Sequence, residues 1–117
     1  MSNPNDKKLK IQNGIIRRMI KEVLGYQSEA KMNEKRIQKM KDDGKDEYDI
    51  KKQEEVLGES YMMIPDSKNR LEAALEKFVL ILEEVQEDPD LDQEILQESQ
   101  KLKAEGEREI VTTGQTA

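Results

Sequence analysis

The side chains that most often carry catalysis and transition-metal binding are missing from this sequence. Its 117 residues include no cysteine and no histidine. Without thiolates there is no disulfide framework and no cysteine-ligated zinc site, and without imidazole the commonest general base is absent. Carboxylates are abundant, but on solvated helix faces nothing shifts their pKa toward acid–base work. Since no nucleotide or dinucleotide motif is present either, we expect neither catalysis nor a cofactor.

Two acidic stretches could suggest calcium binding, namely residues 42–47 and residues 83–92. The first, Asp-Asp-Gly-Lys-Asp-Glu, does not match the ligand spacing of an EF-hand loop. It has no bidentate Glu at the required distance after Gly44, and Lys45 adds a repelling charge. We therefore expect no metal site in either stretch.

The composition is typical of long exposed helices with a narrow apolar stripe. Hydrophobic residues make up 34% of the chain, aromatic residues 3% and charged residues 39%. This apolar fraction is too small to fill a wide core. Disorder is the competing interpretation, and we expect it only at the ends. No segment resembles a signal peptide or approaches the roughly 18 apolar residues of a membrane span, so we expect a cytoplasmic protein without membrane contact.

Apolar residues recur at alternating steps of three and four from Leu9 to Met40, interrupted at Gln12 and Asn33. This spacing predicts one helix over about residues 8–41. Gly44 can take a positive φ after the helix, and Asp46 can cap the next one. The same spacing then resumes and predicts a second helix over about residues 47–87.

Pro65 interrupts the hydrogen bonding of the second helix, so either the helix kinks or two helices abut. The unbroken apolar phase across Pro65 favours a kink. Asp88 as N-cap and Pro89 at the first helical position predict a third helix over about residues 89–105. We expect disorder in residues 1–6 and 106–117. The predicted fold is all-α, an elongated, coiled-coil-like antiparallel three-helix bundle over residues 7–105.

Charge is distributed unevenly along the chain. Residues 1–41 carry 11 Lys and Arg against 4 Asp and Glu, whereas residues 42–117 carry 9 against 22. Two interpretations stay open: the opposite charges face each other within the bundle, or one end offers a charged face to a partner. The acidic total and the scarcity of aromatic side chains argue against nucleic acid as that partner.

Two apolar residues of the second helix are predicted to point away from the core. At about 100° per residue with Ile64 facing inward, Met62 and Leu80 fall on the same outer edge. Such residues can be ordinary isolated surface side chains, or the kink at Pro65 can rotate the phase. The functional interpretation is an apolar outer strip for a partner protein, to which methionine is well suited.

The second helix resembles the tubulin-specific chaperone A family, also called tubulin-folding cofactor A. The first helix adds a weaker match, and residues 8 to about 85 are covered. The second helix carries the resemblance on Tyr48-Asp49-Ile50-Lys51-Lys52-Gln53, Leu57, Glu59-Ser60, Met62-Met63-Ile64-Pro65-Asp66 and Arg70-Leu71-Glu72-Ala73-Ala74. The first helix carries it on Lys8, Lys10, Gly14, Arg17-Arg18, Lys21-Glu22, Tyr26 and Glu29-Ala30.

The resemblance implies a three-helix bundle that uses no nucleotide and captures β-tubulin between chaperonin release and assembly of the αβ heterodimer. It further implies a cytoplasmic, cytoskeleton-associated protein that meets other tubulin-folding cofactors indirectly. The expected partner-binding residues are Tyr61, Met62, Met63, Asp66 and Leu80, with the basic residues Arg17, Lys21, Lys35 and Lys39 as contacts to an acidic surface. The alternative is a structural coiled-coil scaffold or tether acting by self-association. A monomer or a weak homodimer is expected.

Overall fold

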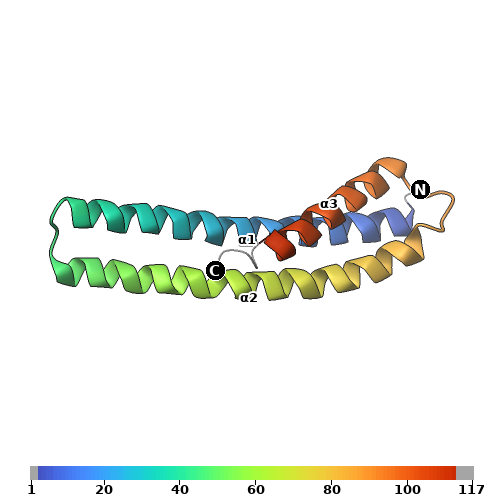
Figure 1. Ribbon diagram of the computed structural model, residues 1–117. Coiled ribbons are helices and arrows are strands. Elements are labelled where there is room, and N and C mark those ends of the chain that lie inside the picture. Colours follow the sequence, from blue (N-terminus) through green and yellow to red (C-terminus); the bar gives the residue numbers. More distant parts are fainter. Residues whose placement is uncertain (1–2, 113–117) are drawn as a thin grey trace. The chain divides into compact units, whose positions relative to one another are not determined.

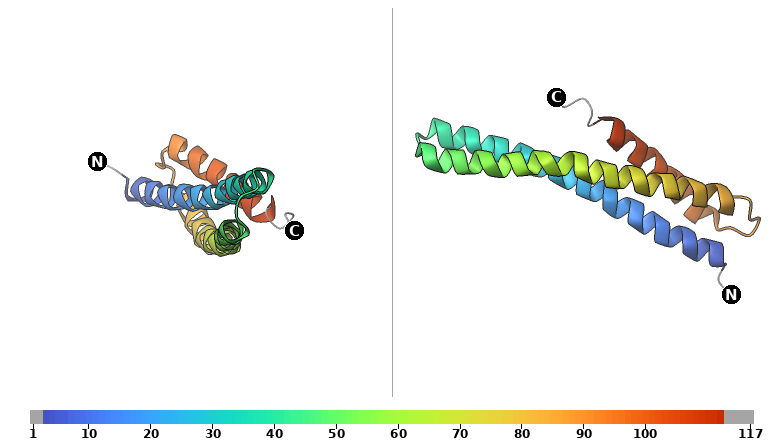
Figure 2. Two further views of the ribbon diagram at one scale, coloured as in Figure 1. Left: turned by 90° about the vertical axis from the view of Figure 1, so that its left-hand side faces the viewer. Right: turned by 90° about the horizontal axis from the view of Figure 1, so that it is seen from below.

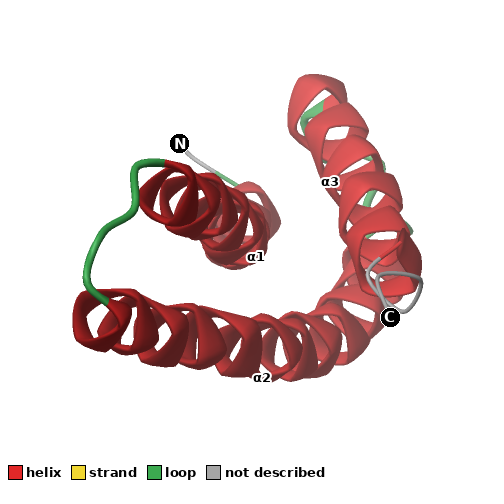
Figure 3. Ribbon diagram, turned by 60° about the vertical axis from the view of Figure 1, so that its left-hand side comes forward, coloured by secondary structure: helices red, strands yellow, loops and turns green. Residues whose placement is uncertain are grey.

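A computed structural model of the chain describes residues 3–112. Its helices are α1 (Pro4–Asp42), α2 (Glu47–Val85) and α3 (Gln93–Thr112). Figure 3 shows that short loops connect the helices, and the described residues contain no strand. The predicted all-α fold of three helices is therefore confirmed.

Local capping explains where α1 and α2 begin and end. Asn3 caps α1, because its Oδ1 accepts a hydrogen bond from the Asn5 backbone N–H at 2.9 Å, and Pro4 occupies the first helical position. Gly44 ends the turn after α1 with a φ of 68°. Asp46 caps α2 through the Tyr48 N–H at 3.3 Å, so the expected roles of Gly44 and Asp46 are confirmed.

The expected disorder of residues 1–6 is wrong for residues 3–6, because the Asn3 cap and Pro4 start α1 earlier than the apolar spacing indicates. Met1 and Ser2 lie outside the described residues. The predicted start of the third helix is also wrong. Asp88 caps only a turn, accepting from the Asp90 N–H, whereas Asp92 accepts from the Glu94 N–H and caps α3.

The ends of the last two helices also differ from the prediction. Helix α2 stops at Val85, two residues early, and α3 continues past Gly106 to Thr112. The expected disordered tail is therefore wrong for residues 106–112, and residues 113–117 lie outside the described residues. Helix α2 runs through Pro65 as one helix, which excludes two abutting helices; the kink itself stays a prediction.

The described residues fall into two compact units, and both α1 and α2 contribute to each. Among the described residues, the three-helix unit consists of residues 3–21 and 68–112. It combines the first part of α1, the last part of α2 and all of α3, which lie side by side in Figures 1 and 2. The hairpin unit is Glu22–Ser67, the antiparallel remainder of α1 and α2 joined by the turn at Gly44.

The three-helix unit holds most of the buried apolar side chains. Phe78 and Leu71 of α2 are fully buried, and Leu102 of α3 packs into the same core. The other buried apolar residues of this unit are Leu9, Ile16, Ile20, Leu75, Ile81, Leu82, Val85 and Leu91. Burial of this many apolar side chains is what stabilises a small helical domain.

The hairpin unit has a much thinner core along its seam, by which we mean the line where α1 and α2 meet within Glu22–Ser67. Its buried apolar side chains are Val23, Ala30 and Ile37. Buried polar residues complete the seam, and the Asn33 amide donates to the Ser60 hydroxyl at 3.3 Å. Asn33, where the apolar spacing breaks, is thus one member of a buried polar pair.

Candidate functional site

The expected partner-binding residues divide between the two units. The three-helix unit contains Arg17, Lys21 and Leu80. The hairpin unit contains Lys35, Lys39, Tyr61, Met62, Met63 and Asp66. Each group is therefore described within its own unit.

Met62 and Leu80 are both strongly exposed, as the helical phase predicted. The relative exposure is 73% for Met62 in the hairpin unit and 67% for Leu80 in the three-helix unit. Leu80 stands out because its neighbours in the apolar run 78–82 are buried or half-buried. Exposed apolar side chains of this size are candidate contacts for a partner protein.

Tyr61, Met62 and Met63 do not share one face, because successive residues of an α-helix are turned by about 100°. Met62 is exposed, whereas Met63 is half-buried. Tyr61 turns toward α1, where its hydroxyl donates a hydrogen bond to the Glu34 carboxylate. One flat partner surface can therefore reach Met62 but not all three side chains at once.

Asp66 lies three residues after Met63 and four after Met62, spacings that place it beside both side chains on α2. The Asp66 side chain is exposed, and it takes part in interactions within the chain. Together with Met63 it forms an edge of the hairpin unit that is distinct from the Tyr61 edge. The stretch expected as one site is thus spread around the helix.

The basic residues of α1 differ in what they contact. Lys35 and Lys39 of the hairpin unit and Lys21 of the three-helix unit are exposed. Arg17 is exposed as well, but its guanidinium lies 3.1 Å from the Glu98 carboxylate of α3. This pair agrees with opposite charges facing each other within the three-helix unit, and so does the Lys8–Glu84 pair at 3.7 Å.

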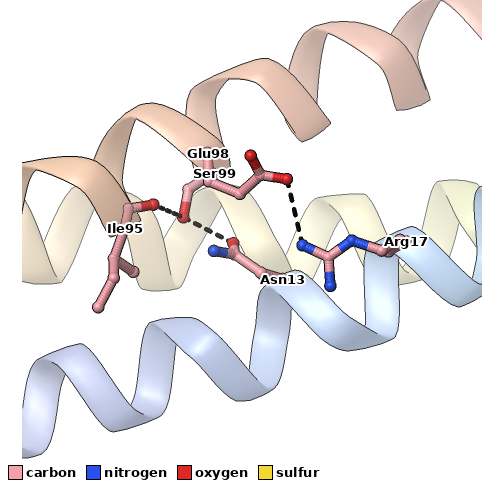
Figure 4. A network of polar contacts seen from close by, with 5 residues as sticks. All are labelled: Asn13, Arg17, Ile95, Glu98 and Ser99. Carbon is pink, nitrogen blue, oxygen red and sulfur yellow. Dashed lines mark hydrogen bonds and ion pairs between the residues drawn. The ribbon is translucent and has the colours of Figure 1, made fainter.

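Figure 4 shows the polar network around Arg17. Next to the Arg17–Glu98 pair, the buried Ser99 hydroxyl lies 2.6 Å from Asn13 Oδ1 and 3.0 Å from the Ile95 carbonyl oxygen. Buried polar atoms need such partners, since an unpaired one costs about 1–3 kcal/mol. The network joins α1 to α3 and therefore has a structural role.

A shallow groove of about 350 Å³ runs beside this network in the three-helix unit. Its lining mixes two cations with two carboxylates, and the full set is Lys10, Asn13, Arg17, Glu94, Ile95 and Glu98. Because the lining combines positive and negative side chains, its electrostatic potential favours neither an anionic nor a cationic ligand. Within residues 3–112, no cluster of three or more acidic side chains is arranged to hold a metal ion.

Two features of the surface were not anticipated from the sequence. Tyr48, at the start of α2, is 62% exposed, and the Lys52 ammonium lies 5.1 Å from its ring centroid. Met32 on α1 is also exposed and precedes Lys35 and Lys39 on one helix face. The helical phase that identified Met62 would have identified Met32, had it been applied to α1.

Lys68 of α2 contacts the end of α3, and this environment perturbs its pKa. Its ammonium group donates to the Ile110 carbonyl oxygen at 3.3 Å, near the end of α3. Burial lowers the pKa of Lys68, and the Glu109 carboxylate opposes that shift. A cation near the C-terminal end of a helix complements its dipole, so Lys68 attaches α3 to α2.

Among residues 3–112, none of the helices has the length and hydropathy of a membrane-spanning segment.

Residues 4–103 match the family model described as "Tubulin binding cofactor A". The chain is 47% identical to human tubulin-specific chaperone A over 83 residues, which cover 71% of this chain and 77% of that protein. It is 38% identical to tubulin-folding cofactor A of Arabidopsis thaliana over 104 residues, or 89% and 92% of the two chains.

Solved structures agree with the sequence relatives. The crystal structure of tubulin folding cofactor A from Arabidopsis thaliana superimposes with a TM-score of 0.79 at 37% identity, covering 89% of this chain and 96% of that one. Both helices that carried the sequence resemblance fall within the matched residues. The chain therefore belongs to the tubulin binding cofactor A family, a family of tubulin chaperones rather than a known enzyme family.

Proposed function

We propose that this protein captures β-tubulin folding intermediates by stoichiometric binding and holds them until the αβ heterodimer assembles. The observation that carries the proposal is the family match over residues 4–103, because its relatives are named as tubulin chaperones. Action by binding, without catalysis, is consistent with a chain that lacks cysteine and histidine. In this proposal the protein works in the cytoplasm beside the cytoskeleton and meets other folding cofactors only indirectly.

The exposed apolar side chains supply the proposed contact. Met62 and Leu80 are the large apolar residues of α2 with the greatest exposure. Removing such side chains from water on binding is favourable, and a few of them carry most of the affinity of an interface. Met63 and Asp66 form the neighbouring edge, and Tyr61 contributes its ring.

Basic residues of α1 are the other proposed contacts. Lys21, Lys35 and Lys39 are exposed, and Arg17 presents part of its guanidinium beyond Glu98. Rim charges of this kind speed association with an acidic surface more than they strengthen the final complex. We therefore expect capture to slow at high salt while the dissociation rate changes little.

The experiment compares capture of β-tubulin released from a chaperonin reaction, measured on native gels or by size-exclusion chromatography. The test variant is Met62→Glu with Leu80→Glu. The matched control is Ile11→Glu with Val111→Glu, because Ile11 and Val111 are 55% and 68% exposed but were not assigned to the site. Circular dichroism of each variant establishes that helicity is unchanged.

We expect the wild type and the control to form a complex and the test variant to bind at least roughly tenfold more weakly. Equal capture by all three proteins would keep the function and reject the site. If the wild type captures no β-tubulin but sediments as a dimer, the function is rejected and self-association as a scaffold is favoured.

A further inference from the structure

We propose that the hairpin unit opens along its seam while the three-helix unit stays folded, and that the open form takes part in holding tubulin. The second half of this inference rests on the function proposed above. The first half concerns the free chain alone and is tested without tubulin.

Core content differs sharply between the two units. In the described chain the hairpin unit buries three apolar side chains, Val23, Ala30 and Ile37, whereas the three-helix unit buries eleven. Regions with few buried apolar side chains open at lower free energy than the remainder of a protein. Seam residues such as Leu57 and Ile64 are only half-buried, so they contribute less than fully buried ones.

Polar residues occupy the centre of the seam. Asn33 and Ser60 are buried and bonded to each other, and Ser67 is buried with its hydroxyl donating to the Ile64 carbonyl oxygen of its own helix. A buried polar pair fixes the register of two helices but stabilises them less than packed apolar residues would. The hairpin therefore closes in one register with a small net gain.

The helices of this unit also contain residues that are poorly compatible with an isolated helix. Gly25, Gly58 and Pro65 all fall within it. Relative to alanine, each glycine costs about 1 kcal/mol of helix propensity and an interior proline about 3 kcal/mol. Most of the stability of a helix in a protein comes from tertiary packing and not from helix propensity, so separation of the two segments should also unfold their backbones.

Opening would uncover apolar side chains that the closed hairpin buries. On the closed unit, exposed apolar side chains such as Met32 and Met62 lie on different helices, and no third helix of the unit gathers them. The seam instead buries Val23, Ala30 and Ile37 of α1, and opening would expose all three. Newly exposed apolar side chains can bind the exposed apolar surface of an incompletely folded protein.

Hydrogen–deuterium exchange of the full chain tests the opening. We expect backbone amides of residues 22–67 to exchange at least roughly tenfold faster than buried-helix amides of residues 68–85. Equal rates in both units, rising together with denaturant, would show one global unfolding event and overturn the inference.

Engineered disulfides then test whether opening is needed for capture. Because the chain has no cysteine of its own, only the introduced pair can form a disulfide within it. Asn33→Cys with Ser60→Cys places thiols at two positions that already meet across the seam, where Asn33 Nδ2 lies 3.3 Å from Ser60 Oγ. The matched control, Asn13→Cys with Ser99→Cys, joins α1 to α3 at a buried pair 2.6 Å apart. Both pairs replace one buried Asn–Ser contact, and each locks a different unit.

Oxidation of the 33–60 pair should slow exchange in the hairpin unit at least roughly tenfold and reduce β-tubulin capture, and reduction should restore both. Oxidation of the 13–99 pair should leave capture unchanged. Full capture by the oxidised 33–60 protein would overturn the link between opening and binding. Failure of the unmodified wild type to capture tubulin would instead reject the proposed function and leave the exchange result standing.

Discussion

The hydroxyl of Tyr61 donates a hydrogen bond to the carboxylate of Glu34 across the seam of the hairpin unit. Although Tyr61 was expected to face a partner, its polar end is bonded within the chain, and only its ring remains available. This bond raises the pKa of Tyr61; burial and the negative charge of Glu34 add to the rise. The contact therefore links the hairpin's stability to alkaline pH.

Tyr61→Phe should remove this dependence. The folded-state pKa of Tyr61 lies above its ordinary value of 10.0, so the stabilisation is complete below pH 10 and is lost as pH rises through the folded pKa. We expect the melting temperature of the wild type to fall more steeply than that of Tyr61→Phe as the pH rises above 10. Tyr48→Phe is the control and should keep the wild-type slope; identical slopes for all three proteins would contradict the prediction.

Asp88 should produce the opposite dependence at acid pH. Hydrogen bonds from Asn3, Asn5 and the Asp90 backbone N–H lower the pKa of Asp88 below its ordinary 3.8. Its stabilisation is therefore present above pH 3.8 and is lost as pH falls through the lower folded pKa. Asp88→Asn should have a lower melting temperature than the wild type at neutral pH, and its melting temperature should fall less on acidification. Circular dichroism follows both changes.

The control for Asp88 is Asp90→Asn, which keeps the backbone N–H that contacts Asp88. Its melting temperature should fall as steeply as that of the wild type below about pH 4. An Asp88→Asn variant with an unchanged acid profile would show that the bonds from Asn3 and Asn5 do not contribute to stability.

Gly106 should not tolerate alanine, even though it lies inside α3. A Cβ at position 106 would lie 3.0 Å from Leu75 Cδ1 and 3.1 Å from Leu75 Cδ2, and Leu75 is buried. The crowding should outweigh the gain in helix propensity, so Gly106→Ala should lower the free energy of unfolding by about 1 kcal/mol. Gly25→Ala, which meets nothing within 4 Å, should instead raise it by about 0.5–1 kcal/mol. Urea titration measures both, and stabilisation by Gly106→Ala would show that Leu75 moves aside freely.

Ser99→Ala should be destabilising because it leaves the buried Asn13 Oδ1 without its donor. The expected loss in the free energy of unfolding is about 1–3 kcal/mol. A double-mutant cycle with Asn13→Leu measures the interaction between the two side chains apart from what each contributes alone. The double variant should recover part of the lost free energy of unfolding. Strictly additive losses would mean that the two side chains do not stabilise each other.

Helical periodicity alone determined much of this structure. The three/four spacing located α1 and α2 because an amphipathic helix repeats its buried face every 3.6 residues. The same phase correctly placed Met62 and Leu80 outside, since orientation around a helix follows directly from position in the sequence. Gly44 and Asp46 were assigned correctly because turn and cap preferences act within a few residues.

Tertiary structure decided what depends on residues far apart in the sequence. Asp88 has the local signature of a helix cap, yet its side chain accepts bonds from Asn3 and Asn5, more than 80 positions away. Gly106 resembles a helix end, but α3 continues because the glycine lets it approach Leu75 closely. Asn33 interrupts the apolar spacing, yet Ser60 makes it one member of a buried polar pair, as Ser99 does for Asn13. In each case the distant contact outweighs a local preference of about 1 kcal/mol, and only folding supplies that contact.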